Sequence, residues 1–220
     1  MEIDILTTLS PHHIYFCNSL AKEYKVNIVL EEPRSPSYYD TSDRLDDLLL
    51  ETDIKTLLNN NKLEGFTSYN SIIEVENINN LKDINSELSI VYGTGIIKKD
   101  LISQYKVMLN LHGGDPSKYR GLDTNLWAFF HSDFNNMGVA LHHVSPELDT
   151  GDLIQFMNID PASKLAEIRA KSAVVSYNLV KNYLDGVYDN RRISYTPGRY
   201  YRAMPSAIKK FLRENHIESN

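Results

Sequence analysis

The stretch that decides the fold is residues 106–121, which read KVMLNLHGGDPSKYRG. An apolar run leads into Asn110 and His112 and then directly into a Gly-Gly-Asp-Pro turn. A buried strand that ends on polar residues beside a flexible loop is typical of α/β folds, which deliver side chains to a cleft at the carboxyl ends of their strands. Because side chains alternate along a strand, we expect Asn110 and His112 on the same face.

The residue types of this pair suggest chemistry at a carbonyl group. An amide and an imidazole side by side can hold and polarise a carbonyl, and imidazole can also move a proton near neutral pH. A second stretch, residues 138–154, reads GVALHHVSPELDTGDLI and supplies a carboxylate, Asp149, in a Leu-Asp-Thr-Gly turn. His142 and His143 would point to opposite faces of a strand, so we expect only one of them to face the site.

Taken in order, the motifs Asn-x-His, Tyr-Arg-Gly and Leu-Asp-Thr-Gly-Asp resemble those of the folate-dependent formyltransferases. This family includes glycinamide ribonucleotide transformylase, methionyl-tRNA formyltransferase and the sugar N-formyltransferases. The resemblance implies that Asn110, His112 and Asp149 form the catalytic trio. It also places His142 near the site, among the residues that bind the co-substrate.

In one respect the chain departs from the family pattern. The family usually follows the histidine with Pro-Ser-Leu-Leu-Pro, whereas residues 113–117 are Gly-Gly-Asp-Pro-Ser. The His-Gly-Gly-Asp-Pro form looks most like the branch that acts on nucleotide-linked amino sugars. The resemblance therefore implies transfer of a formyl group from N10-formyltetrahydrofolate to the amine of a nucleotide-linked amino deoxysugar. Glycinamide ribonucleotide transformylase and a catalytically silent folate- or nucleotide-binding relative are the alternatives.

The resemblance further implies which residues hold the two substrates. The co-substrate side comprises Tyr92, Gly93, Thr94, Gly95, Ile96, Ile97 and His142. Candidates for the amine substrate are His12, His13 and Arg34 near the first strand-to-helix turn, where a helix N-terminus can hold an anion, together with Asp115, Lys118, Tyr119 and Arg120 in the loop after the site. The residues alone also allow a structural explanation of the amine-substrate candidates. The histidines can be exposed on a capped helix, the loop can be a solvated turn, and the tyrosine can be a packing residue.

A metal site is the remaining alternative from a different class. His112, Asp115, His142, His143, Asp149 and Asp152 are all residue types that ligate metal ions. No pair among them shows the His-Glu-x-x-His spacing of a metal-binding helix, so we expect no metal.

Composition limits the class of protein further. A net charge of -6, from 23 basic and 29 acidic residues, argues against general nucleic-acid binding. The single cysteine excludes an internal disulfide and favours a cytoplasmic protein. The chain has no apolar run long enough to span a bilayer, and its start lacks the features of a signal peptide.

Apolar runs of strand length alternate with helical patterns along the chain. They predict an α/β, Rossmann-like fold with a mostly parallel sheet flanked by helices and a mixed edge formed by an antiparallel pair at 137–144 and 153–159. We expect residues 1–186 to form the catalytic domain, and 187–220 an appendage with a hairpin at 193–204 and a short helix. Because aromatic residues are enriched in interfaces, segment 193–204 also predicts a homodimer.

Overall fold

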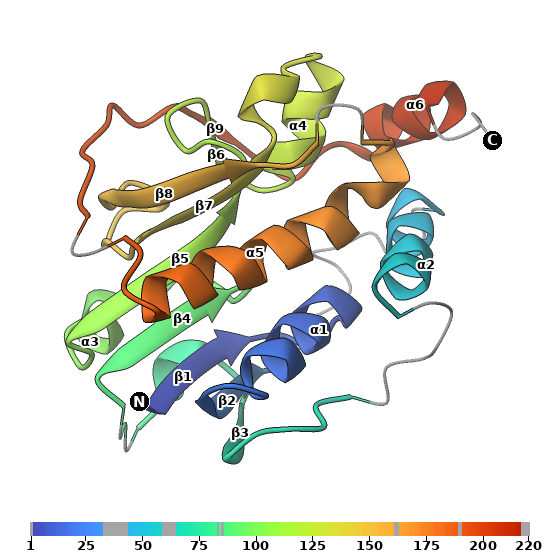
Figure 1. The fold of residues 1–220 in the computed structure, drawn as a ribbon. Coiled ribbons are helices and arrows are strands. Elements are labelled where there is room, and N and C mark those ends of the chain that lie inside the picture. The colour runs from blue at the N-terminus through green and yellow to red at the C-terminus, as the bar shows by residue number, and fades with distance from the viewer. Residues whose placement is uncertain are drawn as a thin grey trace.

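A mostly parallel sheet forms the centre of the protein (Figure 1). The computed structural model describes residues 2–32, 44–58, 65–82, 84, 86–160, 163–188 and 191–216. In this part of the chain the main sheet consists of β1 (Glu2–Thr7), β2 (Lys25–Glu31), β3 (Ser71–Val75), β4 (Leu88–Tyr92), β5 (Val107–Gly113), β7 (Gly138–His143) and β8 (Leu153–Asn158). The strand order is β3-β2-β1-β4-β5-β7-β8. Pairing is parallel from β3 to β5 and antiparallel from β5 to β8.

Helices cover both faces of this sheet. The α-helices are α1 (Pro11–Leu20), α2 (Arg44–Leu58), α3 (Lys99–Ile102), α4 (Thr124–Phe130), α5 (Ile168–Leu184) and α6 (Ser206–His216). Short 3-10 turns occur at η1 (Ile78–Asn80), η2 (Phe134–Asn136) and η3 (Leu165–Glu167). Helices α1 and α5 lie side by side across one face, while η1 and α3 cover the other (Figure 1).

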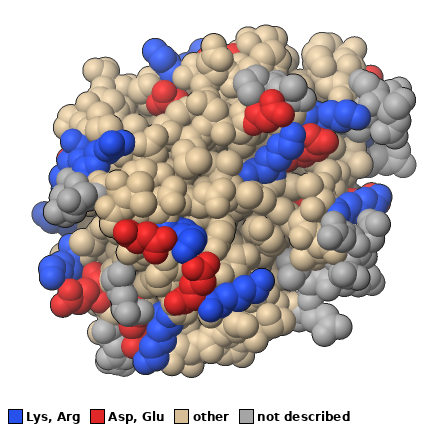
Figure 2. Space-filling view, viewed as in Figure 1, with Lys and Arg blue, Asp and Glu red and all other residues tan. Residues whose placement is uncertain are grey.

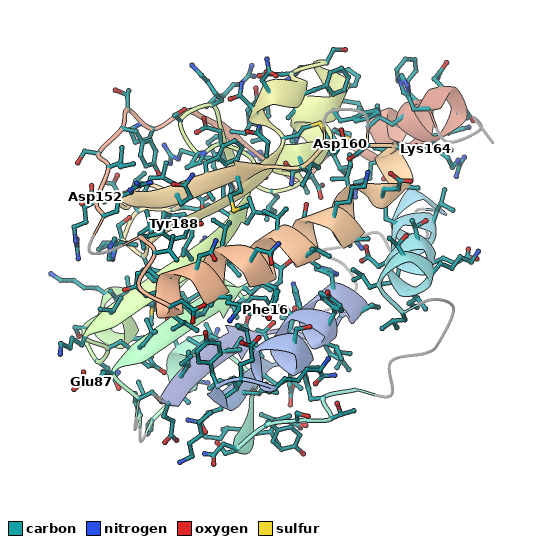
Figure 3. The ribbon with its side chains drawn as sticks, viewed as in Figure 1. Phe16, Glu87, Asp152, Asp160, Lys164 and Tyr188 are labelled. Carbon is teal, nitrogen blue, oxygen red and sulfur yellow. The ribbon has the colours of Figure 1, made fainter. Side chains whose placement is uncertain are left out.

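The alternation of side chains along β1 explains why both faces of the sheet are apolar. Ile3 and Ile5 point into the cluster under α1 and α5, whereas Leu6 points into the cluster under η1 and α3. Phe16, labelled in Figure 3, is fully buried where α1 meets the first of these clusters. Interior parallel strands that are apolar on both faces are typical of doubly covered α/β sheets.

The expected fold class is confirmed, including the mixed edge. The antiparallel pair predicted at 137–144 and 153–159 forms as β7 and β8. The proposed division at residue 186 stays a prediction.

The hairpin predicted over residues 193–204 is wrong. Instead, Ile193 forms a bridge with Leu153, and β9 (Arg199–Tyr201) pairs in parallel with β6 (Tyr119–Gly121), a strand that the sequence did not predict. Gly198 does not form a hairpin turn, because it lies against the backbone of Lys118, where a Cβ atom would come within 2.5 Å. A Pro-Gly turn signal here marks a close approach of two backbones.

The surface mixes charges of both signs. On the face shown in Figure 2, Lys and Arg side chains lie among Asp and Glu side chains and are not gathered by sign. None of the helices that the structure describes has the length and hydropathy needed to span a bilayer.

Candidate active site

A cavity of about 650 Å³ opens at the carboxyl ends of β1, β4 and β5. Strand order reverses between β1 and β4, and open α/β sheets bind their ligands at such a switch point. The cavity wall includes all three residues of the expected trio, Asn110, His112 and Asp149, together with His142 but not His143. The topology therefore brings together residues that lie far apart in the sequence.

The orientation of the Asn110 amide is set by His142 on the neighbouring strand. His142 Nδ1 lies 2.8 Å from the carbonyl oxygen of His143, so this nitrogen carries the proton. Burial lowers the pKa of His142 to about 4, which leaves the ring neutral with a lone pair on Nε2. Asn110 Nδ2 donates to that atom at 3.1 Å. The second amide hydrogen of Asn110 is then the donor that a reacting oxygen can use.

His112 is held in one tautomer by a backbone carbonyl. Its Nε2 donates to the carbonyl oxygen of Tyr119 at 2.8 Å, and its Nδ1 lies 3.5 Å from Asp149 Oδ1. The ring nitrogen that remains available for proton exchange is therefore Nδ1, on the Asp149 side. Asp149 Oδ1 also lies 3.9 Å from His142 Nε2. The His112–Asp149 distance is loose for a hydrogen bond, as is common before substrate binds, whereas the neutral His142 ring has no proton on Nε2 to donate to Asp149.

Asp149 sits in a strained turn that several contacts fix. Its φ of 52° is in the left-handed region, which is uncommon for a residue other than glycine. The Gly121 N–H donates to Asp149 Oδ2 at 2.9 Å, and the Tyr195 hydroxyl donates to the Asp149 carbonyl oxygen at 3.0 Å. Arg120 Nε donates to the carbonyl oxygen of the preceding Leu148 at 3.1 Å. The carboxylate is therefore positioned by segments that precede and follow it by many residues.

The loop after β4 forms a second side of the cavity. All six predicted residues from Tyr92 to Ile97 line the cavity. Gly93 has φ +80°, and a Cβ atom there would come within 2.3 Å of His13 Cε1, so glycine lets the loop pack on that ring. The Gly95 N–H donates to Glu31 Oε2 at 2.7 Å. Glu31 thus fixes this loop from the end of β2, a role that the sequence did not suggest.

The start of α1 forms the third side. His12 and His13 both line the cavity, and their rings lie 4.2 Å apart between centroids. Burial and the nearby Arg169 guanidinium hold the pKa of His12 well below its usual range. Burial does the same for His13, whose Nδ1 lies 3.0 Å from the Thr8 carbonyl oxygen. Burial raises the pKa of Asp53, behind His12, to about 7.

Four of the predicted amine-substrate residues do not line the cavity. They are Asp115, Lys118, Tyr119 and Arg120. The Asp115 side chain accepts from the Ser117 N–H, and the Tyr119 ring is buried with its hydroxyl donating to Asp133. Their described contacts are structural, so their assignment to substrate stays a prediction without support from placement. Arg34 lies outside the described residues.

Several residues of the cavity wall were not predicted. They include Glu31, Thr124, Asn125, Arg169 and Tyr200. Arg169 lies in the first turn of α5, and Tyr200 lies on β9. No local sequence signal marks either residue, because each reaches the site only through pairing or packing with distant segments. Within the described residues, no group of His, Cys, Asp and Glu side chains is arranged to hold a metal ion.

The buried neutral His142 predicts a pH dependence of stability. Its folded pKa of about 4 lies below the ordinary histidine value of 6.5, so the unfolded chain binds more protons between these two values. The free energy of unfolding should then fall as the pH falls through this window, by up to about 1.4 kcal/mol per pH unit for each proton. Urea unfolding across this range should show a shallower dependence in His142→Gln. An unchanged slope would mean that His142 is protonated in the folded state.

A family comparison identifies the class of protein. The model of the formyl transferase family matches residues 23–179. The chain belongs to the formyl transferase family, and the family resemblance of its motifs is confirmed. The matched region contains Asn110, His112, His142 and Asp149.

Solved structures of formyltransferases share the fold. A 4-N formyltransferase from Francisella tularensis is 15% identical, with a TM-score of 0.58 over 91% of this chain and 76% of that chain. WlaRD, a sugar 3N-formyl transferase solved with dTDP and 5-N-formyl-THF, is 16% identical, with a TM-score of 0.56 over 92% and 69%. PseJ from Anoxybacillus kamchatkensis, solved with UDP-4,6-dideoxy-4-formamido-L-AltNAc and tetrahydrofolate, is 18% identical, with a TM-score of 0.53 over 96% and 90%.

Proposed function

We propose that this protein transfers a formyl group from N10-formyltetrahydrofolate to the amine of a nucleotide-linked amino deoxysugar. The observation that carries the proposal is the meeting of Asn110, His112 and Asp149 at the wall of one cavity. Family membership supports formyl transfer. The ligands of WlaRD and PseJ, a folate together with a nucleotide or nucleotide sugar, support the two substrate classes.

The geometry suggests how the residues share the reaction. The amine nitrogen attacks the formyl carbon, and the carbonyl oxygen becomes an oxyanion that the free hydrogen of the Asn110 amide can stabilise. The amine must then lose a proton, and N10 of the folate must gain one as its bond to the formyl carbon breaks. His112 Nδ1 and Asp149 Oδ1 face each other at 3.5 Å, so this pair can receive the first proton and return it to N10.

The cavity wall has a suitable place for each substrate. Backbone groups and the apolar side chains of Ile96 and Ile97 line the co-substrate side. On the other side, the start of α1 offers backbone N–H groups and the His12 ring for the phosphate-bearing part of the amine substrate. A homodimer and a cytoplasmic location remain predictions. Of the segment expected at the dimer interface, Tyr201 and Met204 pack within the chain, and Tyr200 lines the cavity.

Mass spectrometry tests this function. The protein is incubated with N10-formyltetrahydrofolate and a panel of nucleotide-linked 3-amino and 4-amino sugars, with glycinamide ribonucleotide included. We expect one added formyl group on a nucleotide sugar, with equal rates before and after treatment with a chelator. Formylation of glycinamide ribonucleotide alone would assign the purine-pathway activity instead. Activity that is lost to the chelator and restored by zinc would indicate a metal enzyme.

A further inference from the structure

Asp53 is a buried carboxylate that the proposed reaction does not use. It lies on α2, the exposed fraction of its side chain is 0%, and within the described residues neither of its oxygens has a hydrogen-bond partner. A buried carboxylate is costly unless it is paired. Such a group therefore calls for an explanation in terms of its neighbours.

Two side chains from other helices converge on Asp53. His12 Nδ1, from α1, lies 3.2 Å from Asp53 Oδ2, and Arg169 Nε, from α5, lies 3.9 Å from the same oxygen. His12 is 16% exposed and Arg169 is 27% exposed, and both line the cavity. The carboxylate thus sits behind two nitrogen-bearing side chains whose outer parts face the cavity.

The start of α1 beside this group also favours an anion. Ser10 is the N-cap residue, but its side chain makes no capping bond, and its hydroxyl instead lies 3.3 Å from His12 Nδ1. The first turn of α1 carries no acidic residue. The N–H groups of this turn and the helix dipole therefore add to the positive potential of Arg169 at this end of the cavity.

We propose that Asp53 is a positioning residue that holds His12 and Arg169 at the cavity wall as a binding pair for an anionic group of a ligand. The role rests on the cavity being the substrate site of the proposed function. Phosphates of a nucleotide and carboxylates of a folate share this chemistry. A carboxylate behind the guanidinium fixes its direction, which lowers the ordering cost of binding.

Calorimetric titration tests this role with UDP, dTDP and tetrahydrofolate as probes. We expect Asp53→Asn to weaken the binding of one probe by about tenfold or more, because a misdirected guanidinium loses charge-assisted hydrogen bonds. Loss for UDP or dTDP indicates a phosphate as the anion, and loss for tetrahydrofolate indicates a carboxylate. Glu51→Gln is the matched control, because Glu51 lies on the same helix and is exposed. Equal affinities in wild type and Asp53→Asn, or no binding of any probe to wild type, would overturn the role.

A double-mutant cycle separates positioning from general stability. Arg169→Gln should weaken the same probe, and the two changes together should weaken it by less than the sum of their separate effects, because Asp53 acts through Arg169 and His12. Additive effects, or weakening in proportion to a lower melting temperature, would instead indicate a structural ion pair. If Asp53→Asn leaves the rate of formyl transfer unchanged, this role is overturned and the proposed function is not. If binding depends on Asp53 but the protein transfers no formyl group, the proposed function is overturned and this role is not.

Discussion

His112→Ala and Asp149→Asn should each lower turnover by about a hundredfold or more while the protein stays folded. His112 Nδ1 and Asp149 Oδ1 face each other in the cavity, so either change removes one member of the pair that we propose moves the amine proton. Initial rates with the formyl donor and the amino sugar identified by the panel measure the effect. Circular dichroism measures whether the fold persists.

Two neighbouring residues offer matched controls for these variants. His143→Ala and Asp152→Asn are changes of the same kind, and neither residue lines the cavity. Asp152, labelled in Figure 3, pairs with Arg192 at 3.7 Å and accepts from the Ser194 hydroxyl. We expect both controls to keep most of the activity. Near-normal turnover in a folded His112→Ala or Asp149→Asn protein would contradict the proposed trio, and equal losses in all four would favour a metal site.

Gly121→Ala should reduce both stability and turnover. Gly121 has φ +99°, its N–H donates to Asp149 Oδ2, and a Cβ atom there would come within 2.1 Å of the Tyr201 carbonyl oxygen. The added methyl group must push β9 away from β6 or move the N–H that holds Asp149. We expect a loss of about 1–3 kcal/mol in the free energy of unfolding. A displacement of the carboxylate by about 1 Å costs up to about a hundredfold in rate.

Gly65→Ala separates the contact from the backbone conformation. Gly65 has a similar φ of +108°, but among the described residues other than its chain neighbours no atom lies within 4 Å of the position that its Cβ would occupy. It should therefore show only the cost of a positive φ, about 1–2 kcal/mol, with unchanged turnover. Chemical denaturation and initial rates measure both proteins. Equal rates in the two variants would show that β9 does not position Asp149.

Local sequence patterns were sufficient to predict the mostly parallel sheet and its antiparallel edge. The run before Asn110 is apolar, and the strand that contains it ends at a glycine turn. The strand and the polar residues at its end can therefore be predicted from neighbouring residues alone. Parallel strands joined by helices then place the carboxyl ends on one edge. The segment near Pro197 was misread, because its glycine serves a contact with Lys118, which is distant in sequence.

Candidates for the site could be named only where motifs recur in a recognisable family. The resemblance names Asn110, His112 and Asp149, and all three line one cavity, while their catalytic roles stay predictions. The tautomer of His112 was not predictable, because a backbone carbonyl of β6 sets it and not the carboxylate of Asp149. Asp53 and Arg169 could not be found either, since packing between helices brings them together.

The pairing of β6 with β9 has a consequence for synthesis of the chain. Asn110 and His112 leave the ribosome long before residues 199–201, whose pairing supports the segment that holds Asp149. Tyr195, which also contacts that turn, is made nearly as late. A nascent chain that ends before this region therefore carries the motif residues without the contacts that Tyr195 and β9 supply. Because contacts of such sequence separation form late in folding, catalytic competence should be among the last properties that the new protein acquires.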